Sequence, residues 1–403
     1  MPIRNELLLA DMDVLVCGLA FTGRTETVED YFKTRVKSLV SIGISSCFLK
    51  ENLSFCRVYE QGKLVNEFSV PNLRLKEYQW YRQPLMPFVV LMYFWAISLA
   101  LRKVKKKYGL CIGISHSFGL WGVILKKVGV VRQCVYYCLD YYIPYSGAGF
   151  HGLFIKLLNA MDRFNVRKSD YVWDVSEKVS EYRQIYGNLK KDSYKKIIVP
   201  MGYSRSLRVL NDFDAGSRWN IGFVGSITAN QGLQLLVEAM PDILKELPRV
   251  RVKIIGQGPF SEELKSLVKN RNLGEYFEFL GFIKNDSKML DILSRCAIAL
   301  AVYSDSVENK NIICADTGKP KLYALIGLPI VLTKFLLFSE EVDKNKAGIS
   351  IDYTKEDLKN ACVYLLRDES RLREFRDNSY RMGEQFISDK IYDEVIKNMF
   401  SLK

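Results

Sequence analysis

The chain has 403 residues, of which 48% are apolar and 26% charged, so it is long enough for more than one hydrophobic core and too apolar for a disordered chain. We therefore expect two domains. The formal charge of +13, from 58 Lys and Arg against 45 Asp and Glu, favours anionic partners such as phospholipid, nucleotide diphosphate or nucleic acid.

Nine cysteines, an odd number without a C-x-x-C pair, indicate reduced thiols in a cytoplasmic protein. Most of them lie in apolar runs, where a thiol behaves as a small hydrophobic group, and we predict no metal site. Acidic residues interrupt the first apolar stretch, MPIRNELLLADMDVLVCG, so we expect a first strand there rather than a signal peptide.

The first half alternates short apolar runs with segments of helical periodicity, which predicts a parallel sheet. The expected strands are DVLVCGL, GISSCFL, LCIGIS, QCVYYCL, DYVWDV and KKIIVP. The expected helices cover residues 26–41, 84–101, 153–167 and 177–185.

The expected helix at residues 84–101, PLMPFVVLMYFWAISLAL, is unusually apolar and is followed at once by RKVKKK. It is slightly short for a membrane span, which needs about 20 apolar residues, and it contains Pro87. We favour a helix lying in the membrane interface, with its lysines on anionic headgroups: Lys103, Lys105, Lys106 and Lys107. The alternative is a core helix whose basic end meets the negative end of the helix dipole.

After the strand KKIIVP the periodicity is lost over residues 200–218, which indicates a linker. A second series of strands follows: WNIGFVGS, VRVKIIGQG, YFEFLGF, AIALAVY, LPIVLT and AGISID. Only helical patterns follow Lys355. The sequence thus predicts an α/β protein with Rossmann-like domains at residues 1–204 and 205–380, and a helix over 381–403 that packs back toward the first domain.

Ligands bind at the carboxyl ends of parallel strands, where glycine permits close approach and helix N-termini hold phosphates. Gly225 and Ser226 end one such strand, and Gly256 and Gly258 follow the next. Neither loop matches G-x-G-x-x-G or a P-loop, so dinucleotide or ATP binding is not predicted. A single glycine after a strand more often marks only a tight turn.

The order of GFVGS, VKIIGQGPFSEELKSLV, FEFLGFI, AIALAVY and TGKPKLYALIGLPIVLT resembles the donor-binding half of family-4-like GT-B glycosyltransferases, the glycosyl transferases group 1, of the bacterial surface-polysaccharide type. The resemblance implies two Rossmann-like domains that face each other across a cleft. It places Gly225, Gly256 and Gly258 against a nucleotide-sugar donor. Gly318 and Lys319 match the G-K of the family motif, and Lys319 would face the diphosphate.

The chain departs from the family pattern at three positions. Ser226 and Gln231 stand where the family commonly has cations, and Leu322 stands where it has a glutamate. We take Ser226 and Gln231 as donor-binding nevertheless, and the nearby charged residues as substitutes for the glutamate: Glu308, Asp316 and Lys321. The alternative is that Glu308 and Asp316 are solvated loop carboxylates.

The first domain resembles the acceptor half of this fold more loosely, through loops that follow three of its strands. Gly23 ends the first of these loops and would contribute to the donor site, while His116 and Asp140 follow two later strands and are, with Lys319, our candidate catalytic residues. Asp140 stands where many members have a histidine, and it is our first choice for a substrate-facing group. Asp140 could instead cap a turn, His116 could be structural, and His151 looks structural.

The resemblance implies a retaining transferase that moves a hexose-type sugar from a UDP- or GDP-linked donor to a glycan or polyprenyl-linked acceptor in surface polysaccharide synthesis. The nucleotide sugar is a co-substrate, and neither a cofactor nor a metal is expected. We expect a cytoplasmic protein, peripheral on the inner face of the cell membrane, without nucleic acid as a partner.

Three other functions stay open at this point. A sugar-nucleotide epimerase on the same scaffold would change the sugar without an acceptor. A non-catalytic homologue would bind a sugar nucleotide without transferring it, as the departures at Ser226, Gln231 and Leu322 allow. A basic nucleic-acid-binding protein is less well supported, because the chain lacks the aromatic platforms or recognition helices that would specify one.

Overall fold

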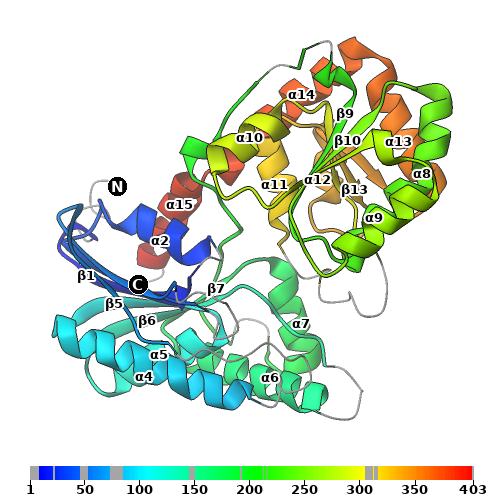
Figure 1. Cartoon of the computed structure of the whole chain (residues 1–403). Coiled ribbons are helices and arrows are strands. Elements are labelled where there is room, and N and C mark those ends of the chain that lie inside the picture. The colour runs from blue at the N-terminus through cyan, green and yellow to red at the C-terminus, as the bar shows by residue number, and fades with distance from the viewer. Residues whose placement is uncertain are drawn as a thin grey trace. The chain divides into compact units, whose positions relative to one another are not determined.

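The computed structural model describes residues 9–20, 23–45, 53–72, 85–144, 150–190, 193–211, 213–214, 216–304, 312 and 316–401, apart from the side chains of residues 86, 150 and 151. The chain forms two compact units. Unit 1 comprises Met1–Pro200 and Ser388–Lys403, and unit 2 comprises Met201–Ile387 (Figure 1).

Unit 1 is built on an eight-stranded sheet of order β4-β3-β2-β1-β5-β6-β7-β8. Its strands are β1 (Asp13–Leu19), β2 (Ser38–Ile44), β3 (Phe55–Glu60), β4 (Lys63–Ser69), β5 (Tyr108–Ile114), β6 (Val131–Cys138), β7 (Tyr171–Asp174) and β8 (Lys196–Ile198). Strands β3 and β4 run antiparallel to their neighbours, and the other pairs are parallel. The strand order reverses between β1 and β5, which is where such sheets bind ligands.

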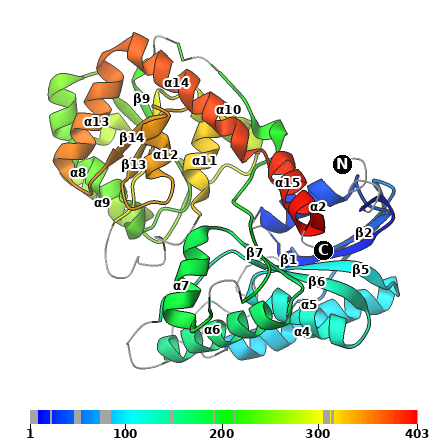
Figure 2. The same cartoon turned by 180° about the vertical axis from the view of Figure 1, so that it is seen from behind.

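Helices cover both faces of this sheet (Figures 1 and 2). They are α2 (Arg24–Phe32), α4 (Met86–Val104), α5 (His116–Lys127), α6 (Phe150–Lys168), α7 (Glu177–Gly187) and α15 (Ser388–Ser401). Apolar residues of α2 and α15 pack together against one face. Helices α4, α5, α6 and α7 bury their apolar sides against the other. Both layers are needed because the central strands are apolar on both faces.

Unit 2 has a six-stranded, all-parallel sheet of order β11-β10-β9-β12-β13-β14. Its strands are β9 (Asn220–Val224), β10 (Arg251–Ile255), β11 (Phe277–Gly281), β12 (Ile298–Ala301), β13 (Ile330–Thr333) and β14 (Gly348–Ile351). Its helices are α8 (Leu233–Glu246), α9 (Ser261–Asn270), α10 (Asp286–Ser294), α11 (Gly318–Leu325), α12 (Ser339–Lys344), α13 (Lys355–Arg367) and α14 (Glu369–Gly383). The order reverses between β9 and β12, so the loops after these strands carry the candidate site.

The two chain segments that connect unit 2 to unit 1 lie side by side within unit 2. Tyr203 forms a parallel bridge with Ile387, and its amide donates to the carbonyl of Phe386 at 2.8 Å. The division falls after Pro200 and after Ile387, whereas we expected it after residues 204 and 380. Residue 380 lies inside α14, whose helical hydrogen bonds carry unit 2 past that point.

The local structure differs from expectation in one further region. We predicted a helix over residues 26–41 and a strand at GISSCFL, residues 43–49. Instead, α2 ends at Phe32 and the strand β2 is Ser38–Ile44, while residues 46–49 lie outside the described residues. Every residue of β2 is buried, because β1 and β3 flank it and helices cover both faces, so its apolar run reads equally well as a buried helix. The β3–β4 hairpin was not predicted.

Helix α4 is the one described helix whose length and composition would allow it to cross a membrane. Its segment Pro87–Val104 has a mean hydropathy of 1.5. One side of α4 is buried in the core of unit 1, through Val89, Tyr93 and Ile97 among others. The expected segment is therefore helical and is partly a core helix.

A buried ionic cluster fixes α6 and α7 to the sheet of unit 1. The Nε and Nη2 atoms of Arg183 donate to Asp162 at 2.8 and 2.9 Å, and Nη1 donates to Asp174 at 2.5 Å. Tyr136 also donates to Asp162, at 2.9 Å. Burial alone would raise the pKa of Asp162, but the guanidinium outweighs it and holds that pKa below the usual value.

Replacing Arg183 by Met should lower the free energy of unfolding by about 3–5 kcal/mol, because it leaves two buried carboxylates without a cation. Urea unfolding followed by circular dichroism would measure the change. Lys178→Met is the control: Lys178 pairs with Glu181 at 2.8 Å on the surface, and its loss should cost less than about 1 kcal/mol. Equal effects of both variants would contradict the structural role of the cluster.

Candidate active site

The loop after β9 is shaped by Gly225, whose backbone φ of +143° is one that other residues rarely adopt. A Cβ atom at this position would collide with the Cε atom of Lys319. The amide of Gly225 is not open to a ligand, because it donates to the carbonyl of Ile255 at 2.9 Å. Gly225 therefore contributes space rather than a hydrogen bond, and Lys319 occupies that space.

Lys319 lies in the first turn of α11, with its ammonium enclosed by unit 2. The Nζ atom lies 4.7 Å from the ring centre of Phe223 and 4.9 Å from that of Tyr303. It donates to the side-chain oxygen of Gln231, and the Tyr303 hydroxyl is 3.4 Å away. Burial lowers the pKa of Lys319 to about 7. Within the described part of the chain, no carboxylate forms an ion pair with it.

Gly256 and Gly258 hold the neighbouring loop against the Gly225 loop. A Cβ atom on Gly256 would collide with the carbonyl oxygen of Gly225, and one on Gly258 with that of Ile227. The two loops also share a backbone hydrogen bond, from Ile227 to Gln257 at 3.1 Å. These glycines are thus explained by backbone packing. Their contact with a donor stays a prediction, as does that of Ser226, which is exposed on the same loop.

Asp316 and Lys321 form a buried ion pair, with Nζ and Oδ1 2.5 Å apart. Both also hold Met201: the Asp316 carboxylate accepts from its amide, and Lys321 donates to its carbonyl at 3.2 Å. Tyr203 adds a bond of 3.1 Å to the carbonyl of Gly318. This network attaches the start of unit 2 to α11. Direct donor contact of Asp316, Gly318 and Lys321 stays a prediction, and Glu308 lies outside the described residues.

In unit 1, the predicted residues follow the carboxyl ends of three adjacent strands, β1, β5 and β6. Gly23, with φ of +69°, precedes the first turn of α2, and the buried Arg24 follows it. Asp140 comes two residues after β6. Desolvation raises the pKa of the Asp140 carboxyl, and Arg24 opposes that shift. Asp140 is therefore close enough to Arg24, at the N-terminus of α2, for the guanidinium to affect its pKa. Residue 140 as a whole is exposed, although its carboxyl is partly desolvated by the surrounding atoms.

His116 begins α5 and is buried. Its ring centre lies 6.1 Å from that of Tyr136 and 5.8 Å from that of Tyr142. Burial lowers its pKa to about 4, so the imidazole is neutral at pH 7. Its Nε2 atom has no hydrogen-bond partner among the described residues. A neutral, enclosed imidazole can shape a site or accept a hydrogen bond, but it cannot supply a proton at neutral pH.

Most of unit 2 matches a known protein family. Residues 214–382 match the family described as glycosyl transferases group 1. Unit 2 is a group 1 glycosyltransferase domain. A comparison with the sequences of curated proteins finds no match.

Solved structures show the fold of the whole glycosyltransferase. Sucrose-phosphate synthase from Thermosynechococcus elongatus is 14% identical, with a TM-score of 0.71 over 97% of this chain and 100% of that one. HepE of Anabaena, in complex with UDP-glucose, is 13% identical, with a TM-score of 0.63 over the same shares. The pneumococcal O-GlcNAc transferase GtfA, in complex with UDP and GlcNAc, is 15% identical, with a TM-score of 0.57 over 90% of this chain and 70% of that one. The predicted GT-B fold is confirmed.

One group of side chains in the glycosyltransferase has the composition of a metal site. Ligand atoms of His116, Cys138 and Asp162 all lie within 4.8 Å of one another and are buried. The carboxylate of Asp162 is already held by two bonds from Arg183. A dication here would have to displace or adjoin that guanidinium, which is electrostatically unfavourable. The group is better explained as part of the ionic cluster.

Three residues that contact the candidate site residues of one unit or the other were not singled out from the sequence. Phe223 and Tyr303 enclose the Lys319 ammonium, and Arg24 lies beside Asp140. Tyr303 follows the strand AIALA by two residues, so the rule that ligands meet the carboxyl ends of strands could have identified it. Nothing in the sequence pattern marks Phe223, which also reads as an ordinary core residue.

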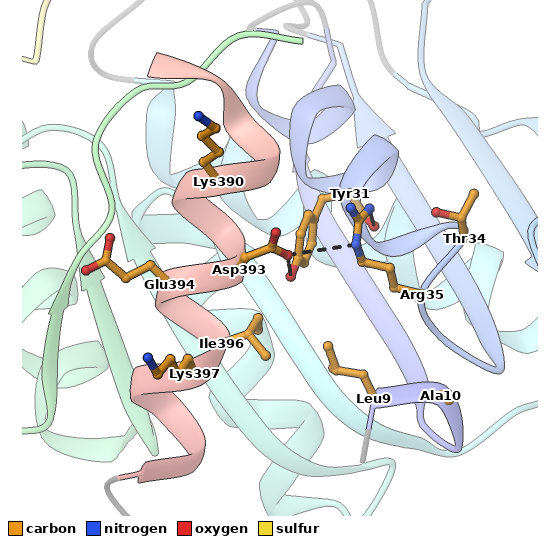
Figure 3. Close-up of a pocket in the computed structure, with 10 residues that line it drawn as sticks. All are labelled: Leu9, Ala10, Tyr31, Thr34, Arg35, Lys390, Asp393, Glu394, Ile396 and Lys397. Atoms are coloured by element: carbon orange, nitrogen blue, oxygen red, sulfur yellow. Dashed lines mark hydrogen bonds and ion pairs between the residues drawn. The ribbon is translucent and has the colours of Figure 1, made fainter. Parts of the chain in front are cut away.

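A pocket of about 780 Å³ opens on the α2 and α15 face of unit 1 (Figure 3). Within it, Tyr31 donates to Asp393 at 2.8 Å, and Arg35 approaches Asp393 at 4.0 Å. The pocket is lined by residues at and just after the carboxyl end of α2, such as Tyr31 and Arg35. The candidate residue Gly23 instead precedes the amino end of α2, where the chain arrives from β1. The pocket is therefore separate from the candidate site.

Replacing Gly225 by Ala should destabilise unit 2 by about 1–3 kcal/mol, because the new methyl group requires a strained φ and displaces Lys319. Thermal unfolding would measure this effect. Gly274→Ala is a matched control, since a Cβ atom there meets no atom within 4 Å. A wild-type melting temperature for Gly225→Ala would contradict the close packing of Lys319 on this loop.

Proposed function

We propose that this glycosyltransferase moves a hexose-type sugar, with retention of configuration, from a UDP- or GDP-linked donor to a glycan or polyprenyl-linked acceptor in surface polysaccharide synthesis. Unit 2 would bind the donor and unit 1 the acceptor. The observation that carries the proposal is the enclosed ammonium of Lys319. It lacks a carboxylate partner among the described residues, and it lies beside the loops that follow β9 and β12.

An anion is the ligand that this arrangement favours. Desolvating an ammonium without a counter-charge is unfavourable, and a bound diphosphate would remove that cost. Lys319 also lies in the first turn of α11, where amides without intrahelical acceptors and the helix dipole add positive potential. The missing side chain at Gly225 gives the Lys319 side chain room beside the loop that follows β9. A diphosphate placed here would be held by charges already fixed in position.

In the proposed reaction, the bond between the sugar C1 and the donor diphosphate breaks, and a new bond forms from C1 to the acceptor oxygen. The diphosphate leaves with the bonding electron pair, and Lys319 stabilises its new charge. The acceptor hydroxyl enters on the face that the diphosphate leaves, and a donor phosphate oxygen takes its proton. Asp140, at the carboxyl edge of unit 1, would orient the sugar hydroxyls, while neutral His116 would shape the wall beside Tyr142.

The base is proposed from the relatives. The HepE and GtfA structures contain UDP or a UDP-sugar, so UDP-linked donors are the first to test, with GDP-linked donors second. The proposed reaction draws on no cofactor and no metal, and chelation with EDTA is expected to leave its rate unchanged. The protein is proposed to work in the cytoplasm, peripherally on the inner face of the cell membrane.

Thermal-shift measurements with UDP, GDP, ADP and CDP, alone and as sugars, should show stabilisation by one base, because a ligand that binds only the native state raises the melting temperature. Lys319→Ala should abolish the shift and slow transfer by about 100-fold, the effect of removing one electrostatic donor. Asp140→Asn should keep the shift and lose transfer. No shift with any nucleotide would contradict the proposed donor site, and a changed sugar without a new linkage would indicate an epimerase.

Affinity for the nucleotide sugar should fall as pH rises above about 7. The ligand-free protein loses the Lys319 proton near that pH, whereas the bound diphosphate favours the charged amine, so binding must take up a proton at higher pH. One coupled proton gives a decrease of up to about tenfold per pH unit. Isothermal titration between pH 6 and 9 would measure it. Lys319→Gln should bind weakly with a flat profile, and an unchanged slope in that variant would assign the proton to another group.

A further inference from the structure

The helices α4, α5 and α6, on one face of the unit 1 sheet, are almost free of acidic residues. Neither α4 nor α5 contains an aspartate or glutamate. Helix α6 contains one, Asp162, and Arg183 neutralises it in the interior. In the sequence, no acidic residue occurs between Glu77 and Asp140. The outward surface of this helix layer is therefore cationic without counter-charges of its own.

Exposed cations border this surface. Four follow one another at the carboxyl end of α4: Arg102, Lys103, Lys105 and Lys107. Others are exposed on or just beside α5 and α6: Lys127, Lys156, Arg167 and Lys168. The two basic side chains that have acidic partners bind them at the edges, Lys106 to Glu60 and Lys126 to Asp170, both at 2.6 Å.

The same helices expose large apolar side chains. On α4, Phe88, Leu91 and Trp95 are 49%, 63% and 56% exposed, and their spacing places them on one side of the helix. On α6, Leu153 is 65% exposed and Leu157 is 36% exposed. Exposed apolar and cationic side chains thus occur together on α4 and α6, the two helices that flank α5 on the same face (Figure 2).

The opposite face of the same sheet is different. Helices α2 and α15 carry carboxylates among their basic residues, including Asp30, Asp389 and Asp393, and these form ion pairs with Lys33 and Arg35. Helix α7, on the same face as α4, α5 and α6, carries Glu177 and Glu181, and these pair with Lys196 and Lys178. The excess positive charge of unit 1 is therefore concentrated on α4, α5 and α6. This asymmetry is what distinguishes a docking face from a generally basic surface.

Helix α4 is also held in place from its other side. Val89, Tyr93, Ile97 and Ala100 are buried in the core with strands β1 and β2. A helix with one side in the core and Phe88, Leu91 and Trp95 in solvent is placed to lie along a bilayer rather than to cross it. Apolar side chains at the level of the acyl boundary with cations at the headgroups are the features of an interfacial helix.

We propose that α4, α5 and α6 together form a docking face for an anionic phospholipid bilayer. Phe88, Leu91, Trp95 and Leu153 enter the interface, and the basic residues around them bind the headgroups. The proposal rests on the membrane contact suggested under the proposed function, which it assigns to a three-helix face, and it does not depend on the transfer reaction. A nucleic acid would use the cations but would leave the exposed leucines, Leu91, Leu153 and Leu157, without a role.

Flotation of the full chain with phosphatidylcholine vesicles, with and without 30% phosphatidylglycerol, tests the proposal. We expect binding to the anionic vesicles only, and at least tenfold weaker binding for Phe88→Ser/Leu91→Ser/Trp95→Ser. The decisive variant is Leu153→Ser/Lys156→Glu on α6, which should weaken binding by a similar factor. Matched controls on unit 2, Phe282→Ser and Lys269→Glu/Arg271→Glu, remove an exposed aromatic side chain and two exposed cations, and should bind as wild type.

Wild-type binding by the α6 variant would overturn the three-helix face, and equal binding to neutral vesicles would overturn the anionic headgroup. Displacement of the protein from vesicles by a short oligonucleotide at equal phosphate concentration would assign the face to nucleic acid instead. Circular dichroism melting temperatures identify variants that fail to fold. Nucleotide thermal shifts of the same variants should match wild type, which separates failure of this proposal from failure of the proposed donor site.

Discussion

The loops at the carboxyl edge of the unit 2 sheet depend on one constraint: no side chain fits at position 225. Because Gly225 lacks a Cβ atom, the methylene chain of Lys319 passes over its backbone and the ammonium comes to lie among Phe223, Tyr303 and Gln231. Gly256 has to be a glycine for a related reason, since the carbonyl of Gly225 fills the place of its side chain. The neighbouring loops thus fix one another through backbone contact, and the charge they surround is fixed with them.

The buried cations Arg183, Lys321 and Lys319 differ in what surrounds them. Arg183 and Lys321 are buried with carboxylates in contact, so each belongs to a cluster that is complete without a ligand. Lys319 is enclosed by aromatic rings and an amide oxygen, which attract a cation but do not neutralise it. Burial therefore lowers the pKa of Lys319. A group in that state gains more from an arriving anion than a paired one does.

The sequence predicted the parts of the fold that follow from local pattern. Strand runs ending in glycine predicted β9 and β10, and the G-K of the family motif predicted the position of Lys319 on a helix that follows a strand. The pattern failed where burial removes periodicity: the SLVSIGI run of β2 is buried on both faces and looks helical. It could not show that Asp316 and Lys321 bind each other, or that the amide of Gly225 is taken by Ile255, because both depend on side chains and loops distant in sequence.

The bridge between Tyr203 and Ile387 joins the two ends of unit 2. The chain therefore enters and leaves unit 2 at one point. Because Asp316 and Lys321 both bind Met201, the residue at which the chain enters unit 2 is also bonded to the helix that carries Lys319. The position of Lys319 thus depends on the ends of unit 2 as well as on the sheet beside it.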